Sequence, residues 1–183
     1  LIVSLVLFLA ACGGETPDPE VAADAPPGTD IHLYDLSGGG ATHVTHITDR
    51  QGYDNQPFFT PDGSAVLFTS DRTGNMDTFA YNVTDGAIRQ VTTTEEGEYS
   101  PTVTPNPSTF SAIRMDLSQV QELWQYPLSG SGTPSKVAMI DRVGYHTWVG
   151  TDRVLFFRLG RPATLQLVTV GKADTTIVAE NVG

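Results

Sequence analysis

The chain has 183 residues and a formal net charge of −11, from 21 acidic residues against 10 lysines and arginines. This balance argues against nucleic acid as a partner, because phosphates require a basic surface. Cys12 is the only cysteine, which excludes a disulfide within the chain.

Residues 1–11 are uncharged and largely apolar, and we interpret them as the end of a signal peptide. The stretch is too short to span a bilayer as a helix, which needs about 20 apolar residues. No methionine or basic segment precedes it, so we expect the natural protein to begin upstream. The run Leu9-Ala10-Ala11-Cys12 resembles the bacterial lipoprotein signal, in which small residues precede a cysteine that is lipidated. Cys12 is therefore the expected lipid attachment site.

Residues 12–29 are predicted to form a tether after the lipidated cysteine. The segment is rich in proline and acidic residues and has no apolar period, which is typical of an extended linker. The lipid is expected to hold the protein on a membrane. In such lipoproteins an aspartate directly after the cysteine favours the inner membrane. Here that position is Gly13, which indicates the outer membrane. The predicted location is the periplasmic side of a bacterial cell envelope.

From Asp30 onward, short alternating or apolar runs are separated by Gly, Pro, Asp and Asn, which is the pattern of antiparallel strands and tight turns. A unit of four runs repeats with a period in the mid-forties, since Pro101 lies 44 residues after Pro57. The predicted units are a half unit at 30–48 and full units at 53–92, 98–139 and 145–180.

This period predicts an all-β chain folded as a β-propeller of four-stranded antiparallel blades. About three and a half blades are present at this period, because residues 30–48 match only the third and fourth strands of a blade. An unclosed ring would leave sheet edges open to water. We therefore expect six blades in the full protein, with about 110 further residues after Gly183.

The second unit carries the most specific motif. It reads Gln56-Pro57-Phe58-Phe59-Thr60-Pro61-Asp62-Gly63, followed after an apolar strand by Ser70-Asp71-Arg72. This pattern resembles the repeat of TolB-like β-propellers, a WD40-like family. The stretches 52–57 and 144–148 also resemble a subgroup of small TolB-like lipoproteins. The resemblance implies a propeller that binds partner proteins of the cell envelope.

No catalytic motif is present in the sequence. There is no G-x-S-x-G elbow and no P-loop, and Gly38-Gly39-Gly40 opens no predicted helix. His43 and His46 resemble a metal-binding pair, but residues three apart on a regular strand point to opposite faces. The aspartates are scattered one per turn, which disfavours calcium. We therefore predict neither a metal nor a cofactor.

One set of residues is a candidate binding site. Equivalent positions of successive blades converge on the axis of a propeller, so residues just before each innermost strand are expected to surround the mouth of the channel. Their aromatic and acidic side chains suit a peptide or a small ligand, and the alternative is that they only pack between blades. The candidates are Tyr53, Asp54, Glu98, Tyr99, Tyr145 and His146.

Two classes of function follow from these observations. The first is a non-enzymatic, membrane-anchored module that binds a protein or peptide, or acts as a scaffold, in the cell envelope. The second is an enzyme, either a metal-dependent lactonase-like hydrolase or the propeller portion of a prolyl-oligopeptidase-like peptidase. The peptidase would need a catalytic domain beyond Gly183. The lack of a catalytic motif in the sequence favours the first class.

Overall fold

The computed structural model describes residues 28–182. Within this range the chain forms fourteen β-strands, and none of these residues belongs to a helix long and apolar enough to cross a membrane. The predicted signal peptide, Cys12 and residues 13–27 lie outside the described residues. Thr29 was predicted to end the tether but belongs to the folded part: its amide donates to the Gly52 carbonyl at 3.0 Å and its carbonyl accepts from the Asp54 amide at 3.2 Å.

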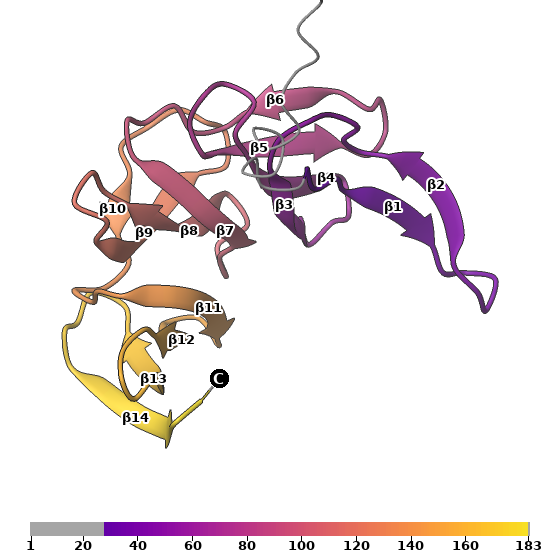
Figure 1. Cartoon of the computed structure of the whole chain (residues 1–183). Helices are drawn as coiled ribbons and strands as arrows, with labels where there is room; N and C mark the ends of the chain where they lie inside the picture. Colours follow the sequence, from indigo (N-terminus) through magenta and orange to yellow (C-terminus); the bar gives the residue numbers. More distant parts are fainter. Residues whose placement is uncertain (1–27, 183) are drawn as a thin grey trace, which may run out of the picture.

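The strands form four antiparallel sheets in chain order (Figure 1). The first blade is a hairpin of two strands and the other three blades have four strands each. This arrangement confirms the predicted all-β propeller fold. The first blade comprises β1 (His32–Asp35) and β2 (Thr42–His46). The second comprises β3 (Asp54–Phe59), β4 (Ala65–Ser70), β5 (Asp77–Asn82) and β6 (Ile88–Gln90). The third comprises β7 (Gly97–Val103), β8 (Thr109–Met115), β9 (Gln121–Pro127) and β10 (Ser135–Lys136). The fourth comprises β11 (Val143–Val149), β12 (Arg153–Arg158), β13 (Thr164–Thr169) and β14 (Thr175–Glu180).

Figure 1 shows the blades fanned along an arc, with β3, β7 and β11 toward its inner side. These are the first strands of the three complete blades, and β7 contacts both β3 and β11. Residues at equivalent positions of the three inner strands are thereby brought near one another.

Apolar clusters hold neighbouring blades together. β4 shows how, because its side chains are buried on both faces. Val66 and Phe68 pack toward the first blade, and Leu67 packs toward the third. A nearly continuous apolar strand is expected where a sheet is covered on both sides. The cluster between the third and fourth blades includes Ile113 and Phe156.

The turn between β3 and β4 is held by its own side chains. Asp62 accepts hydrogen bonds from the Thr60 hydroxyl at 2.7 Å and from the Ser64 amide at 3.1 Å. Gly63 has a φ of 70°, which residues with a side chain rarely adopt. The turn motif of the repeat is therefore explained by local hydrogen bonding.

The inner strands β3 and β7 carry a β-bulge at the same position of the blade. Gln56 and Ser100, at the two register shifts, have φ values of 57° and 53°. Non-glycine residues seldom occupy this left-handed region. The side-chain oxygen of Gln56 accepts a hydrogen bond from the Ser100 amide at 2.8 Å, so the two bulges are joined across neighbouring blades.

A third bulge lies in the first blade and overturns one prediction. β1 and β2 pair His32 with His46 and Tyr34 with His43, and the register shifts between these pairs. Val44 is the extra residue of β2, so His43 and His46 lie on one face although they are three positions apart. The centroids of their rings are 4.7 Å apart. The prediction that they point to opposite faces was wrong, because it assumed a regular strand.

Candidate functional site

The six residues predicted at the channel mouth lie at the start of the inner strands but separate into two groups. Five of them lie within β3, β7 and β11 rather than before these strands, and Tyr53 immediately precedes β3. The three tyrosine side chains are partly or largely exposed, whereas Asp54 and Glu98 are buried and His146 is half-buried with its Nδ1 shielded. The first group is Tyr53, Tyr99 and Tyr145, and the second is Asp54, Glu98 and His146.

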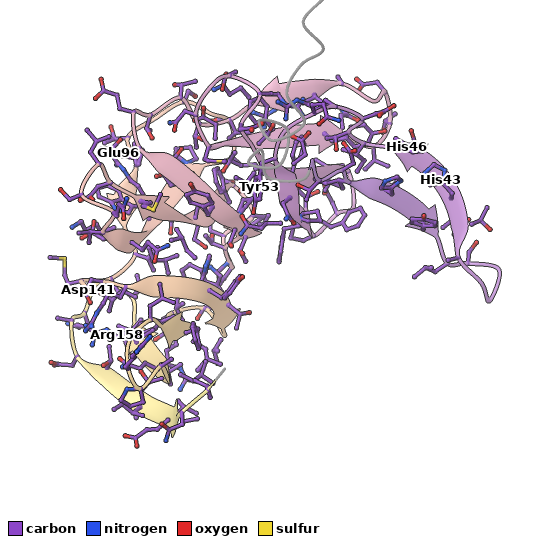
Figure 2. All side chains as sticks on the ribbon, in the orientation of Figure 1. His43, His46, Tyr53, Glu96, Asp141 and Arg158 are labelled. Carbon is purple, nitrogen blue, oxygen red and sulfur yellow. The ribbon has the colours of Figure 1, made fainter. Side chains whose placement is uncertain are left out.

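The tyrosines Tyr53, Tyr99 and Tyr145, which we call the tyrosine cluster, lie at the start of the inner strands of successive blades. Tyr145 is 65% exposed, and the other two are half-buried. Burial raises the pKa of Tyr53, and the nearby phenol groups of Tyr99 and Tyr145 raise this pKa further. Figure 2 labels Tyr53 where the second and third blades meet.

A pocket of about 400 Å³ is lined by Tyr99 and Tyr145 of this cluster, where residues of the second, third and fourth blades meet. Tyr99 and Tyr145 provide aromatic walls, and Gln56, Ser100 and Gln121 provide polar groups. We call it the tyrosine pocket. Its volume falls in the range of about 300–1,000 Å³ that is usual for ligand sites. The two left-handed bulge residues line it, and backbone strain of this kind concentrates at binding sites.

Asp54 is fully buried and serves the fold. Its side chain is 0% exposed and accepts from Arg50 at 3.3 Å and from Arg72 at 3.0 Å. The Arg72 guanidinium also lies over the Phe79 ring, 4.8 Å from its centroid. A buried carboxylate is stable only with such partners. The prediction that Asp54 faces the channel mouth is therefore corrected, because both of its oxygens are used inside the blade.

Glu98 is buried as well, with 0% exposure. One carboxylate oxygen accepts from the Tyr126 hydroxyl at 3.2 Å and is contacted by the Thr94 hydroxyl. The other oxygen has no partner among residues 28–182. Burial raises the pKa of Glu98 to about 7, and the neighbouring Asp77 carboxylate adds to this. Glu98 is therefore protonated below neutral pH and about half protonated at pH 7.

His146 is hydrogen-bonded to Ser111, with 2.7 Å between Nε2 and Oγ. Trp148 donates from Nε1 to the same hydroxyl at 3.0 Å. Burial lowers the pKa of His146 to about 4, so its imidazole is neutral at physiological pH. A serine beside a histidine is part of many hydrolase sites. Here Ser111 is 0% exposed and His146 Nδ1 has no partner among the described residues, so we assign the pair to packing.

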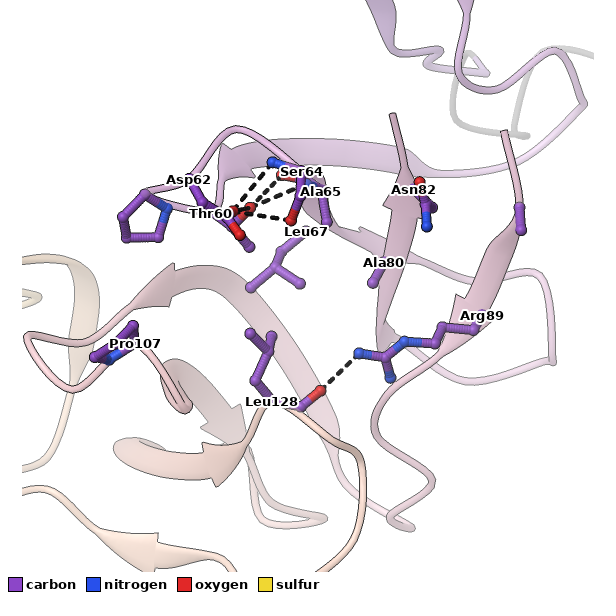
Figure 3. A pocket seen from close by; sticks show the side chains of 12 residues that line it. Thr60, Asp62, Ser64, Ala65, Leu67, Ala80, Asn82, Arg89, Pro107 and Leu128 are labelled. Atoms are coloured by element: carbon purple, nitrogen blue, oxygen red, sulfur yellow. Dashed lines mark hydrogen bonds between the residues drawn. The ribbon is translucent and has the colours of Figure 1, made fainter. Parts of the chain in front are cut away.

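A second pocket, of about 430 Å³, opens at the opposite end of the inner strands, between the second and third blades (Figure 3). Leu67 and Leu128 contribute apolar surface, and Asp62 and Arg89 lie on its border. Arg89 donates to the Leu128 carbonyl at 2.7 Å, and Asp62 is engaged in its own turn. Because these charged groups are already used within the protein, we favour the tyrosine pocket as the candidate site.

The sequence did not identify Gln56, Ser100 or Gln121 as pocket residues. The available signal for the first two was that each precedes a proline, Pro57 or Pro101, at the period of the blades. Residues before proline usually adopt extended backbone, so this signal does not predict a left-handed bulge. Gln121 begins β9 and has no distinguishing pattern.

Known proteins of similar sequence match parts of the chain. The family model of the TolB beta propeller domain matches residues 21–133, which is more than half of the chain. The Tol-Pal system protein TolB of Bordetella pertussis is 48% identical over 42 residues, covering 23% of this chain and 10% of that protein. The uncharacterized protein Atu1656 of Agrobacterium fabrum is 30% identical over 77 residues, covering 42% of this chain and 25% of that protein.

Solved structures show the same fold over most of the chain. TolB from Acinetobacter baumannii has a TM-score of 0.65 at 18% identity, with 82% of this chain aligned to 38% of that one. Oligogalacturonate lyases and peptidases also align, at 11–15% identity. Likeness at this level of identity shows the fold alone. The chain spans well under two thirds of the Bordetella and Acinetobacter proteins that it matches.

Proposed function

The chain belongs to the TolB beta-propeller domain family, and from this premise we propose that it is a non-enzymatic module that binds a protein or peptide segment in its tyrosine pocket. The observation that carries the proposal is a pocket lined by two tyrosines from successive blades, Tyr99 and Tyr145, together with polar groups from two glutamines and a serine.

The chemistry of this pocket suits a polypeptide ligand. A tyrosine offers a large apolar face together with a hydroxyl that can donate or accept a hydrogen bond. Gln121 carries a carbonyl and an amide group, and the Gln56 amide group is a further donor although its oxygen accepts from the Ser100 amide; these groups match the acceptors and donors of a peptide backbone. The net charge of −11 would also attract a basic segment at long range. We therefore expect a peptide that carries an apolar side chain and a positive charge.

We place this module in the bacterial cell envelope, anchored through Cys12 to the periplasmic side of the outer membrane. The support for the anchor is the lipoprotein-like run that ends at Cys12 and the Pro-rich acidic segment after it. Two or three acyl chains hold a protein on a membrane stably, whereas a single chain does not. The pocket would then face partners at the membrane or in the periplasm.

The alternative function, an enzyme, has less support. The hydroxyl of Ser111 lies beside an imidazole but is buried, and the carboxylates of Asp54 and Glu98 are buried too. A hydrolase built on the described residues would need a nucleophile or an activated water that reaches the substrate. The likeness to lyases and peptidases concerns the fold alone and gives no residue such a role.

The proposal is tested by selecting a phage-displayed peptide library on the full chain and measuring the affinity of the selected peptides for variants. Tyr145→Ala should weaken binding at least about tenfold, because a tyrosine in a binding pocket is a frequent energetic hot spot. Ile177→Ala is the matched control, since Ile177 is 53% exposed on β14 and does not line the pocket. Selected peptides that bind Tyr145→Ala as tightly as the original chain would refute the proposed site.

A further inference from the structure

Three of the four histidines of the chain lie within residues 32–46, on the first blade. His32 comes from β1, and His43 and His46 come from β2. Their potential ligand nitrogens all lie within 4.8 Å of one another. Figure 2 shows His43 and His46 next to each other on the hairpin, and the ring centroid of His32 is 4.3 Å from that of His46. All three side chains are exposed.

The backbone fixes this juxtaposition. His32 and His46 are direct cross-strand partners, and the bulge at Val44 brings His43 onto the same face. The opposite face of the hairpin is anchored, because Ile31 and Ile47 beside it are buried against the second blade. Strand pairing therefore fixes the common face from which the three imidazoles project.

The donor set selects a class of ligand. Imidazole nitrogen is a preferred ligand of Zn²⁺, Cu²⁺ and Ni²⁺, whereas Ca²⁺ and Mg²⁺ prefer oxygen. A tetrahedral Zn²⁺ with Zn–N bonds of about 2.0–2.1 Å holds two nitrogens about 3.3 Å apart. Side-chain rotation alone can reduce separations of up to 4.8 Å to this value, because the imidazoles are exposed. Three protein ligands leave one position for water or for a donor from another molecule.

We propose that His32, His43 and His46 form a binding site for a divalent transition-metal ion, with Zn²⁺ as the ion to test. The site is separate from the tyrosine pocket, so its test does not depend on the proposed peptide binding. The bulge at Val44 is what creates it, since without an extra residue a spacing of three would put His43 and His46 on opposite faces.

The test is a titration of the full chain, without a polyhistidine tag and in non-ionic detergent, with Zn²⁺ in competition with a chromophoric chelator. We expect one ion per chain. Co²⁺ in its place should give the visible absorption of a tetrahedral site. His32→Ala, His43→Ala and His46→Ala should each weaken Zn²⁺ binding about 100-fold or more, whereas loss of groups that only orient ligands costs about 10–100-fold. Thr42→Ala is the matched control, since Thr42 is exposed on β2, the strand of His43 and His46. This variant should bind Zn²⁺ as tightly as the original chain.

Folding is followed in the same samples by circular dichroism. Because all three histidines are exposed, their replacement empties no core, and the metal-free variants should melt at the same temperature as the original chain. Added Zn²⁺ should raise the melting temperature of the original chain and not that of the variants. Binding that persists when all three histidines are replaced together, or the absence of saturable binding to the original chain, would overturn the proposal.

Discussion

Replacing Glu98 with glutamine should change how the stability of the protein depends on pH. The Glu98 carboxyl is fully buried, and burial raises its pKa from 4.5 to about 7. Between these values the folded protein retains a proton that the unfolded chain has released. Folding is therefore weakened as pH rises from about 4.5 to about 7. At about 1.4 kcal/mol for each pH unit, the full effect approaches about 3 kcal/mol.

His146 acts in the opposite direction over nearly the same range. Burial lowers its pKa from 6.5 to about 4, so between these values the unfolded chain binds a proton that the folded protein does not. Stability from this group is fully present above pH 6.5 and is lost as pH falls through the window. In the original chain these two contributions oppose each other between pH 4.5 and 6.5.

The assay is urea unfolding from pH 4.5 to 8, with EDTA present so that bound metal does not contribute. Glu98→Gln resembles the protonated carboxyl in shape, and its stability relative to the original chain should grow with pH, by up to about 3 kcal/mol at pH 8. Glu95→Gln is the matched control, because it removes the same charge from an exposed neighbour; it should shift stability by no more than about 0.5 kcal/mol. Parallel pH profiles for Glu98→Gln and the original chain would refute the reasoning.

Two further predictions concern Asp54 and the N-terminus. Asp54→Ala should destabilise the protein by about 3 kcal/mol in urea unfolding, because it removes a buried group that holds two arginines; a loss below about 1 kcal/mol, the value of an exposed ion pair, would contradict this. Cys12→Ser should abolish incorporation of labelled fatty acid and release the protein from membranes, whereas unchanged labelling would refute lipidation.

Much of the fold could be predicted because the repeated strands and turns follow simple rules of burial and turn geometry. The apolar run at β4 (Ala65–Ser70) is buried on both faces, as such a run predicts for a covered sheet. The turn around Asp62 and Gly63 uses side-chain hydrogen bonds and a positive φ, as turn chemistry requires. The number of blades in the full protein and the anchor at Cys12 remain predictions.

The bulges could not be predicted in the same way. Gln56 and Ser100 adopt left-handed backbone where the first strand of each blade shifts register against the second, and the Gln56 side chain accepts a hydrogen bond from the Ser100 amide of the next blade. Val44 is likewise an ordinary strand residue whose bulge depends on its partner strand. Both arrangements depend on contacts between segments, whereas a sequence pattern reports only on its own segment. For this reason the spacing of three between His43 and His46 wrongly predicted that they point to opposite faces of the strand.

The divided roles at the inner strands follow from the alternation of side chains along a strand. Because successive residues point to opposite faces, a tyrosine that borders the pocket has a neighbour that points between blades. This explains why Glu98 is buried beside the partly exposed Tyr99, and why Nδ1 of His146 is shielded beside the exposed Tyr145. Substitutions at the tyrosines should therefore report on ligand binding, and substitutions at their neighbours should report on stability. A loss of peptide affinity in Glu98→Gln without any change in stability would show that the two roles are not separated in this way.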